Sequence, residues 1–135
     1  MEKAVFESDL SETKKVRNFL RKSLLDLKLS EEVHFAIELS VLEIFTNIVR
    51  YAYPKNKDRI FLKTWQEEDE VYVEIKDNGI PFDPSQEPEP DIEKIIETKE
   101  IGGFGILLSR KFMDGFEYRR ENDQNVLTMH KKIFS

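Results

Sequence analysis

The chain contains no cysteine, and this absence excludes disulfide bonds, thiolate metal sites and cysteine nucleophiles. It also fits a reducing compartment. The 2 histidines, His34 and His130, stand far apart without metal-ligand spacing, so a role in packing is the better interpretation of both. Residues 1–7 lack an apolar core of signal-peptide length, and no stretch approaches the length of a membrane span. We therefore expect a cytoplasmic protein.

Basic residues are fewer than acidic ones, with 21 Lys and Arg against 27 Asp and Glu. The formal net charge is -6 with 36% charged residues, which argues against a broad surface for nucleic acid or for an anionic membrane. Any phosphate must then be held locally, by backbone N–H groups, a metal ion or a few cations. The 135 residues, 39% of them hydrophobic, suffice for one core, so we expect a single domain over residues 1–135.

Hydrophobic periodicity predicts an alternation of strands and helices. Strand-like alternation marks residues 3–7, 59–66, 71–76, 116–120 and 126–133. Helical spacing marks a first helix from about residue 11 to about residue 29, a long second helix from the N-cap Ser30 to Tyr53, and a third over 106–113. Four of the 5 prolines lie between residues 81 and 90, where no regular element can continue.

This order of elements favours an α/β (α+β) fold. Hairpins on the C-terminal side supply neighbouring antiparallel strands, and the three helices each have an apolar face to bury. The economical arrangement is a two-layer sandwich, in which a mainly antiparallel, mixed sheet is covered on one face by the three helices.

The first candidate site segment is Glu43-Ile44-Phe45-Thr46-Asn47, within the long helix. Residues three and four apart share a helix face, so Glu43 and Asn47 form a polar stripe on an otherwise apolar helix. A carboxylate and an amide suit a Mg²⁺ ion and a reacting hydroxyl, since Mg²⁺ takes oxygen ligands and keeps waters beside substrate phosphates. The alternative interpretation is a solvated strip on the outside of the helix.

The second segment, Asp77-Asn78-Gly79, follows a strand-like run. An Asn-Gly pair ordinarily indicates a hairpin turn, but residues 80–84 make a poor returning strand, which leaves Asp77 at a strand end facing an irregular loop. A carboxylate fixed there can accept a hydrogen bond from an exocyclic amine such as adenine N6. Gly79 would let a planar base approach the backbone.

The third segment, Gly102-Gly103-Phe104-Gly105-Ile106, is a glycine loop before a helix. The first turn of a helix has unpaired N–H groups, which suit a bound phosphate. The spacing is not that of a dinucleotide fingerprint and no P-loop is present in the sequence, so a loop that merely packs close to the sheet is the alternative.

In this order, the three segments resemble those of the GHKL (Bergerat-fold) ATPases, and within them the small bacterial anti-sigma-factor serine protein kinases. The matching positions are Glu43 and Asn47 of the N-box helix, Asp77 and Gly79 of the adenine turn, and Gly103 and Gly105 of the glycine loop. Residues 112–114, Phe-Met-Asp, also look like the kinase branch. The resemblance spans nearly the whole chain and implies a histidine-kinase-like ATPase domain with ATP and Mg²⁺ as cofactors.

The resemblance further implies roles for individual residues. Asn47 would ligate Mg²⁺, Glu43 would act as general base or orienting carboxylate, and Asp77 would read adenine beside Gly79. The nucleotide's phosphates would be contacted by the loop residues Gly102, Gly103, Phe104 and Gly105. Residues 80–101 would form the mobile ATP lid.

Three positions depart from the family pattern. Tyr51 stands where many relatives have histidine, Phe104 is bulkier than the common leucine or methionine, and Gln124-Asn125 replaces a usual Gly-Thr pair. At the last position, the amide of Asn125 would replace the hydroxyl that supports adenine recognition in relatives.

The function implied is an ATP-dependent serine/threonine protein kinase. Its acceptor would be a STAS-domain anti-anti-sigma protein, and it would sequester a sigma factor or analogous regulator. Arg17 sits where the family carries an arginine used in partner contacts, and a solvated charge is the alternative. The family also implies a homodimer, while direct nucleic acid and membrane binding are not expected. The competing hypothesis is a non-catalytic switch, in which ATP orders the lid and changes partner affinity.

Overall fold

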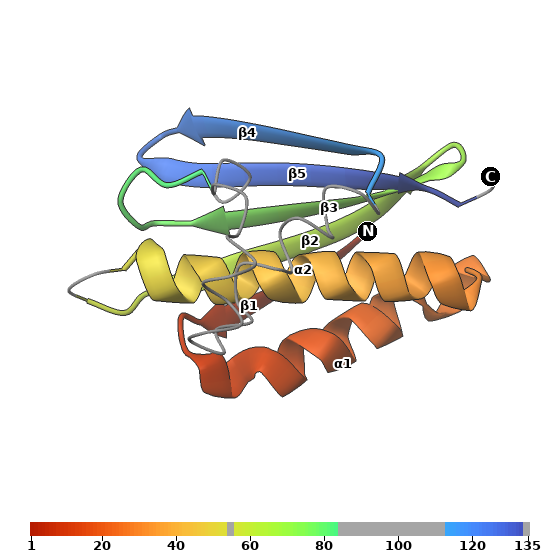
Figure 1. Ribbon diagram of the computed structural model, residues 1–135, viewed down its shortest axis with the longest axis horizontal. Helices are drawn as coiled ribbons and strands as arrows, with labels where there is room; N and C mark the ends of the chain where they lie inside the picture. Colours follow the sequence, from red (N-terminus) through yellow and green to blue (C-terminus); the bar gives the residue numbers. More distant parts are fainter. Residues whose placement is uncertain (54–55, 84–112, 134–135) are drawn as a thin grey trace, which may run out of the picture.

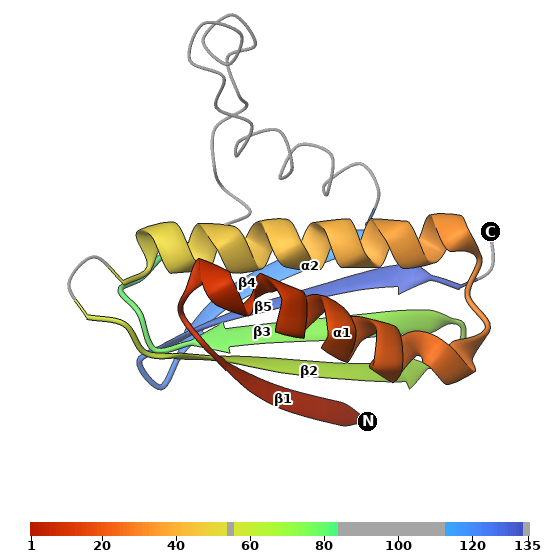
Figure 2. The same cartoon turned by 90° about the horizontal axis from the view of Figure 1, so that it is seen from below.

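The computed structural model of the protein describes residues 1–53, 56–83 and 113–133. Its strands are β1 (Glu2–Glu7), β2 (Arg59–Glu67), β3 (Glu70–Asp77), β4 (Gly115–Glu121) and β5 (Gln124–Lys132). Its α-helices are α1 (Thr13–Leu24) and α2 (Glu31–Tyr51). The strands form one sheet in the order β1-β2-β3-β5-β4, and both helices lie on the same face of it (Figures 1 and 2).

The sheet is antiparallel in each of its described pairings, β1 with β2, β2 with β3, β3 with β5 and β5 with β4. The predicted two-layer form with one covered face is confirmed. The parallel pairing that a mixed sheet needs is not found among the described strands, because β2–β3 and β4–β5 are joined by tight hairpin turns. In the second turn Asn122 and Asp123 both have positive φ, 53° and 62°, which the short polar side chains tolerate.

The first helix is shorter than its sequence predicts. A 3₁₀ turn over Leu10–Glu12 precedes α1, and a second one over Leu25–Leu27 follows it. Lys28, in the left-handed region at φ 52°, then ends the helical path. The start of α2 is as predicted, because the Ser30 hydroxyl accepts a hydrogen bond from the Val33 N–H at 3.2 Å.

The core lies between the sheet and the two helices. It is formed by large apolar side chains that are almost completely buried: Val16 and Leu20 of α1, Ile37, Val41, Ile44, Phe45 and Ile48 of α2, and Ile60, Leu62, Val73, Ile75, Leu127 and Met129 of the strands. Along β3, burial alternates strictly, and the inward positions are Val71, Val73, Ile75 and finally Asp77. The pleat thus carries a carboxylate to the helix-covered face at the end of the strand.

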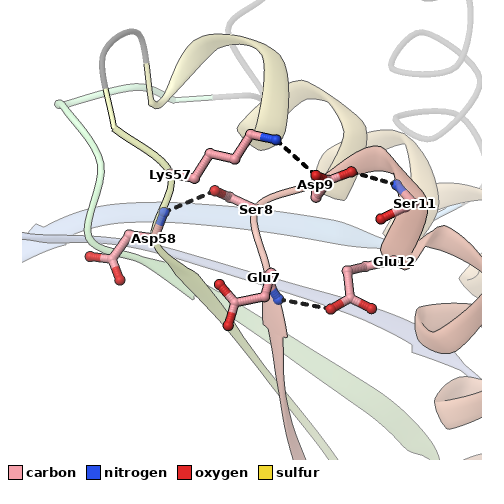
Figure 3. A network of polar contacts seen from close by, with 7 residues as sticks. All are labelled: Glu7, Ser8, Asp9, Ser11, Glu12, Lys57 and Asp58. Atoms are coloured by element: carbon pink, nitrogen blue, oxygen red, sulfur yellow. Dashed lines mark hydrogen bonds and ion pairs between the residues drawn. The ribbon is translucent and has the colours of Figure 1, made fainter.

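A polar network ties the connection between β1 and α1 to the segment before β2, as Figure 3 shows. Ser8, with 1% of its surface exposed, donates its N–H to the Asp58 carbonyl at 2.8 Å and accepts the Asp58 N–H on Oγ at 2.9 Å. Lys57 Nζ lies 2.8 Å from Asp9 Oδ2. This hydrogen bond, with that from the Ser11 N–H, holds the pKa of Asp9 well below its usual range. The network fixes the path by which the chain enters β2.

Several predicted elements lie outside the described residues: the helical turns over 91–97, most of the third helix, and the lid beyond residue 83. Met113, at the end of the predicted third helix, is described and is 5% exposed. Within the described part of the chain, the helices are too short or too polar to cross a bilayer.

Candidate nucleotide site

A row of polar side chains crosses three strands on the helix-covered face of the sheet. The register places Asp77 of β3 opposite Asn125 of β5, and Asn125 opposite Arg120 of β4. Asp77 is 1% exposed and Asn125 is 2% exposed, so both side chains are interior groups that need partners. The Asn125 Nδ2 donates to Asp77 Oδ1 at 2.8 Å.

The Asp77 carboxylate is held on one oxygen. Besides the bond from Asn125, its Oδ1 accepts the Gly79 N–H at 2.9 Å, and within the described residues Oδ2 is left as the available acceptor. Burial raises the pKa of the Asp77 carboxyl, while the two hydrogen bonds and the charge of Arg120 act in the opposite direction. A fixed carboxylate with one open oxygen at a strand end can accept a hydrogen bond from the amine of a purine.

The Asn125 amide uses both of its ends. Its Oδ1 accepts from the Phe82 N–H at 3.1 Å, the Tyr118 hydroxyl at 2.6 Å and the Arg120 Nη1 at 3.2 Å. Its Nδ2 donates to the Ile80 carbonyl at 2.7 Å as well as to Asp77. The amide therefore joins Asp77 to the backbone of residues 80 and 82, directly after the predicted adenine turn; its role in adenine recognition stays a prediction.

Gly79 is required by packing against the end of α2. A Cβ at this position would collide with the carbonyl oxygen of Ala52 and lie 2.7 Å from its Cβ. The same carbonyl accepts the Ile80 N–H at 2.9 Å, so the turn rests directly on the helix terminus. The structure thus gives a reason for glycine other than the predicted approach of a base.

We expect Gly79→Ala to lower the free energy of unfolding by about 1–3 kcal/mol, because the added methyl group overpacks two backbone segments that cannot both move away. Urea denaturation measures the loss. An unfolding free energy within about 0.5 kcal/mol of the wild type would contradict this direct packing.

Tyr53 joins the same turn to the start of β2. Its hydroxyl accepts the Asn78 N–H at 2.8 Å and donates to the Arg59 carbonyl at 3.0 Å. Burial, as the largest cause, raises the pKa of Tyr53, so the hydroxyl keeps its proton. Gln124 Nε2 also donates to Asn78 Oδ1, at 2.9 Å. No sequence pattern predicted the contacts of Tyr53, Tyr118 and Arg120, because these contacts depend on strand register and on the path of the turn.

The polar stripe of α2 is not a solvated strip. Asn47 is 3% exposed, and within the described residues its Nδ2 has no hydrogen-bond partner. Glu43, one turn earlier, is partly exposed. Burial raises the pKa of the Glu43 carboxyl, and the charge of Arg50 partly offsets this. Asn47 thus faces the protein interior, and Glu43 lies one turn away at its partly exposed edge.

The structure brings some predicted residues together and leaves others apart. Asn47 lies five residues before Ala52, about 7.5 Å along the helix axis, so it is near the helix end on which the Asp77 turn rests. Arg17 is instead paired with Glu38 of α2, with Nε 2.9 Å from Oε1. Gly102, Gly103, Phe104 and Gly105 lie outside the described residues. In the described part, no group of three or more His, Asp or Glu side chains is placed to hold a metal ion.

Comparison with known proteins identifies a family and its relatives. The family model for the histidine kinase-like ATPase domain matches residues 6–131. The serine/threonine-protein kinase BtrW of Bordetella bronchiseptica is 34% identical over 101 residues, which cover 74% of this chain and 71% of that protein. The serine-protein kinase RsbW of Bacillus cereus is 28% identical over 95 residues, covering 67% of this chain and 59% of that protein. Both names belong to the enzyme class that the sequence predicts.

A solved structure shares the fold. The histidine kinase AdeS of Acinetobacter baumannii superposes with a TM-score of 0.52 at 11% sequence identity, and the match covers 100% of this chain and 69% of that one. At this identity the similarity concerns the fold alone.

Proposed function

This chain belongs to the histidine kinase-like ATPase family, and from that premise we propose that it is a Mg-ATP-dependent serine/threonine protein kinase. Family membership confirms the resemblance predicted from the sequence, and an ATPase domain of this type implies ATP as the nucleotide. The names of the relatives BtrW and RsbW support the kinase class. We further propose that the acceptor is a STAS-domain anti-anti-sigma protein and that the kinase sequesters a sigma factor or analogous regulator.

The observation that carries this proposal is the buried carboxylate of Asp77. It is locked through Oδ1 by Asn125 and Gly79, and it stands beside the end of the helix that bears Asn47. A carboxylate held so firmly at 1% exposure needs a reason beyond folding, since burying a charge is unfavourable without full pairing. Recognition of the adenine amine supplies that reason.

The α2 side chains fit a nucleotide with its metal ion. Asn47 offers a buried amide whose Nδ2 lacks a partner in the described part of the chain, and amide oxygens are ligands of the kind Mg²⁺ takes. Bound Mg²⁺ would supply charge neutralisation at the phosphates. We assign Asn47 to hold the ion, and the glycine loop, from Gly102 and Gly103 through Phe104 to Gly105, to hold the phosphates with its N–H groups.

Glu43 is assigned to the acceptor hydroxyl. Phosphoryl transfer asks the protein mainly for alignment and charge compensation, with one group to orient the nucleophile and take its proton. Because burial raises the pKa of Glu43 above its ordinary value, the carboxylate is a stronger base than a solvated one. It stands one turn from Asn47 on the same helix face, which suits a hydroxyl brought to the terminal phosphate.

The partner assignments rest on the family and on the surface of α1. The side chain of Arg17 keeps 43% of its surface exposed although it pairs with Glu38, so it can contact a partner protein from a fixed position. We propose Arg17 as a partner-binding residue, residues 80–101 as the ATP lid, and a homodimer as the assembled form.

Calorimetric titration with ATP, with and without Mg²⁺, tests the nucleotide site. We expect Mg²⁺ to tighten ATP binding to the wild type by about tenfold or more, equivalent to about 1.4 kcal/mol. Asn47→Ala should bind metal-free ATP like the wild type and lose this gain, while keeping its fold, since the substitution removes a buried donor that lacks a partner among the described residues. An equal gain in both proteins would contradict the metal role of Asn47.

Labelled ATP separates the kinase from the switch. Incubation of the protein with Mg²⁺, γ-labelled ATP and candidate STAS proteins should transfer label to a serine or threonine of one acceptor. A protein that binds ATP and changes partner affinity, yet leaves every acceptor unlabelled, would be the non-catalytic switch instead.

A further inference from the structure

Arg120 reaches the adenine turn from the edge strand of the sheet. It belongs to β4 and lies in the same cross-strand row as Asn125 and Asp77. Its Nη1 donates to the Gly79 carbonyl at 2.9 Å and to Asn125 Oδ1 at 3.2 Å. One guanidinium nitrogen therefore binds both the backbone of the turn and the amide behind it.

The bond from Arg120 is one of the contacts that set which way the Asn125 amide faces, together with the Ile80 carbonyl, which accepts from Nδ2 at 2.7 Å. An arginine only donates, and so does the Phe82 N–H that meets the same Asn125 Oδ1 at 3.1 Å. If the amide were reversed, its NH₂ group would face these two donors, so the arrangement with Nδ2 toward Asp77 is favoured. That Nδ2 bond at 2.8 Å in turn occupies Asp77 Oδ1 and keeps the carboxylate in its acceptor role.

From this chain of contacts we infer that Arg120 is a positioning residue that sets the preference for 6-amino over 6-oxo purine nucleotides; the inference rests on the proposed function. An ionised carboxylate can accept a hydrogen bond from the N6 amine of ATP. It cannot donate one to the O6 carbonyl of ITP, whose lone pairs it repels. Without Arg120 the Asn125 amide and the Gly79 carbonyl lose a charged donor, and Asp77 loses a nearby positive charge that lowers its pKa. The Asp77 carboxyl can then more readily shift, or carry a proton and donate to O6.

The neighbouring arginine provides a matched control. Arg119 lies on the same strand with its side chain on the opposite face of the sheet, where its Nε is 2.7 Å from Glu121 Oε2 and its Nη2 is 3.7 Å from Glu74 Oε2. Arg119→Met and Arg120→Met thus remove the same guanidinium group from the same strand, and only Arg120→Met removes a contact with Asn125 and the turn.

The test measures dissociation constants for ATP and ITP by calorimetry in wild type, Arg120→Met and Arg119→Met. We expect the wild type to prefer ATP strongly and Arg119→Met to keep that preference. Arg120→Met should lower the ATP-to-ITP preference by about tenfold, the effect expected for loss of one charge-assisted hydrogen bond. Equal weakening of both nucleotides by Arg120→Met, which leaves the preference unchanged, would overturn the inference and indicate a merely structural role.

Two further measurements keep the outcome decisive. If Arg120→Met does not fold, Arg120→Lys replaces it in the test, because lysine retains the charge and the apolar stem. Its shorter reach should still lower the ATP-to-ITP preference. A folded lysine variant with the wild-type preference overturns the inference. Failure of the proposed nucleotide site shows differently, because the wild type itself would then bind no ATP, and failure of the kinase activity alone would leave the ATP-to-ITP preference measurable.

Discussion

Glu43→Ala is expected to abolish phosphoryl transfer to the acceptor while leaving the affinity for ATP within about threefold of the wild type. The reason is that Glu43 is assigned to the hydroxyl of the acceptor and not to the nucleotide. Loss of a general base typically lowers the rate by about 10²–10⁴-fold. Single-turnover transfer of labelled phosphate, beside calorimetry of ATP binding, measures the two quantities separately.

Two companion variants sharpen this test. Glu32→Ala removes an exposed glutamate from the first turn of the same helix and should transfer phosphate like the wild type. Glu43→Gln keeps the shape and hydrogen bonding of the side chain but takes no proton, so a nearly active glutamine variant assigns Glu43 to orientation, whereas an inactive one assigns it to proton transfer. If Glu43→Ala phosphorylates the acceptor as well as the wild type does, the catalytic role is wrong.

Asp77→Asn should weaken ATP binding by about 100-fold with little loss of fold stability. The amide oxygen of an asparagine can still accept the bonds from Asn125 Nδ2 and the Gly79 N–H, now at 2.8 Å and 2.9 Å. Its NH₂ group then takes the place of Oδ2 and faces the N6 amine. Because both groups only donate, binding of the base loses about 2–3 kcal/mol of free energy when the groups are buried. Calorimetry with ATP and thermal unfolding measure the two effects.

Asp123→Asn is the control for this substitution. Asp123 is exposed in the β4–β5 turn at φ 62°, where asparagine is equally well tolerated, so the same chemical change should leave the affinity for ATP unaltered. A folded Asp77→Asn variant with the wild-type affinity would show that Asp77 does not read the base.

Local sequence signals predicted the frame of the site. Ser30 as N-cap and the apolar spacing after it predicted α2, and the alternation over residues 71–76 placed the Asp77 carboxylate at a strand end, because both patterns depend on neighbours close in the chain. The family pattern predicted the amide of Asn125 as a support of adenine recognition; the structure shows its bond to Asp77, and its role in recognition stays a prediction.

Features that depend on distant neighbours were not predicted. The bonds of Arg120 and Tyr118 to Asn125 require the register of β4 on β5, and the contact of Gly79 with Ala52 requires the packing of the turn on α2. The early end of α1 escaped notice because residues 25–27 retain helical periodicity, while the left-handed Lys28 has no strong sequence signature. The roles of Glu43, Asn47 and the glycine loop stay predictions.

The burial of the Asn47 amide, whose Nδ2 has no partner in the described part of the chain, has a consequence for the stability of the fold. Burying the Asn47 side chain at 3% exposure costs free energy, because its Nδ2 loses its hydrogen bonds to water and gains no partner among the described residues. A bound nucleotide that accepted a hydrogen bond from this amide would remove that cost, and it would then stabilise the folded chain as well as occupy the site. Cellular nucleotide level would then govern not only turnover but also how much of the chain stays folded.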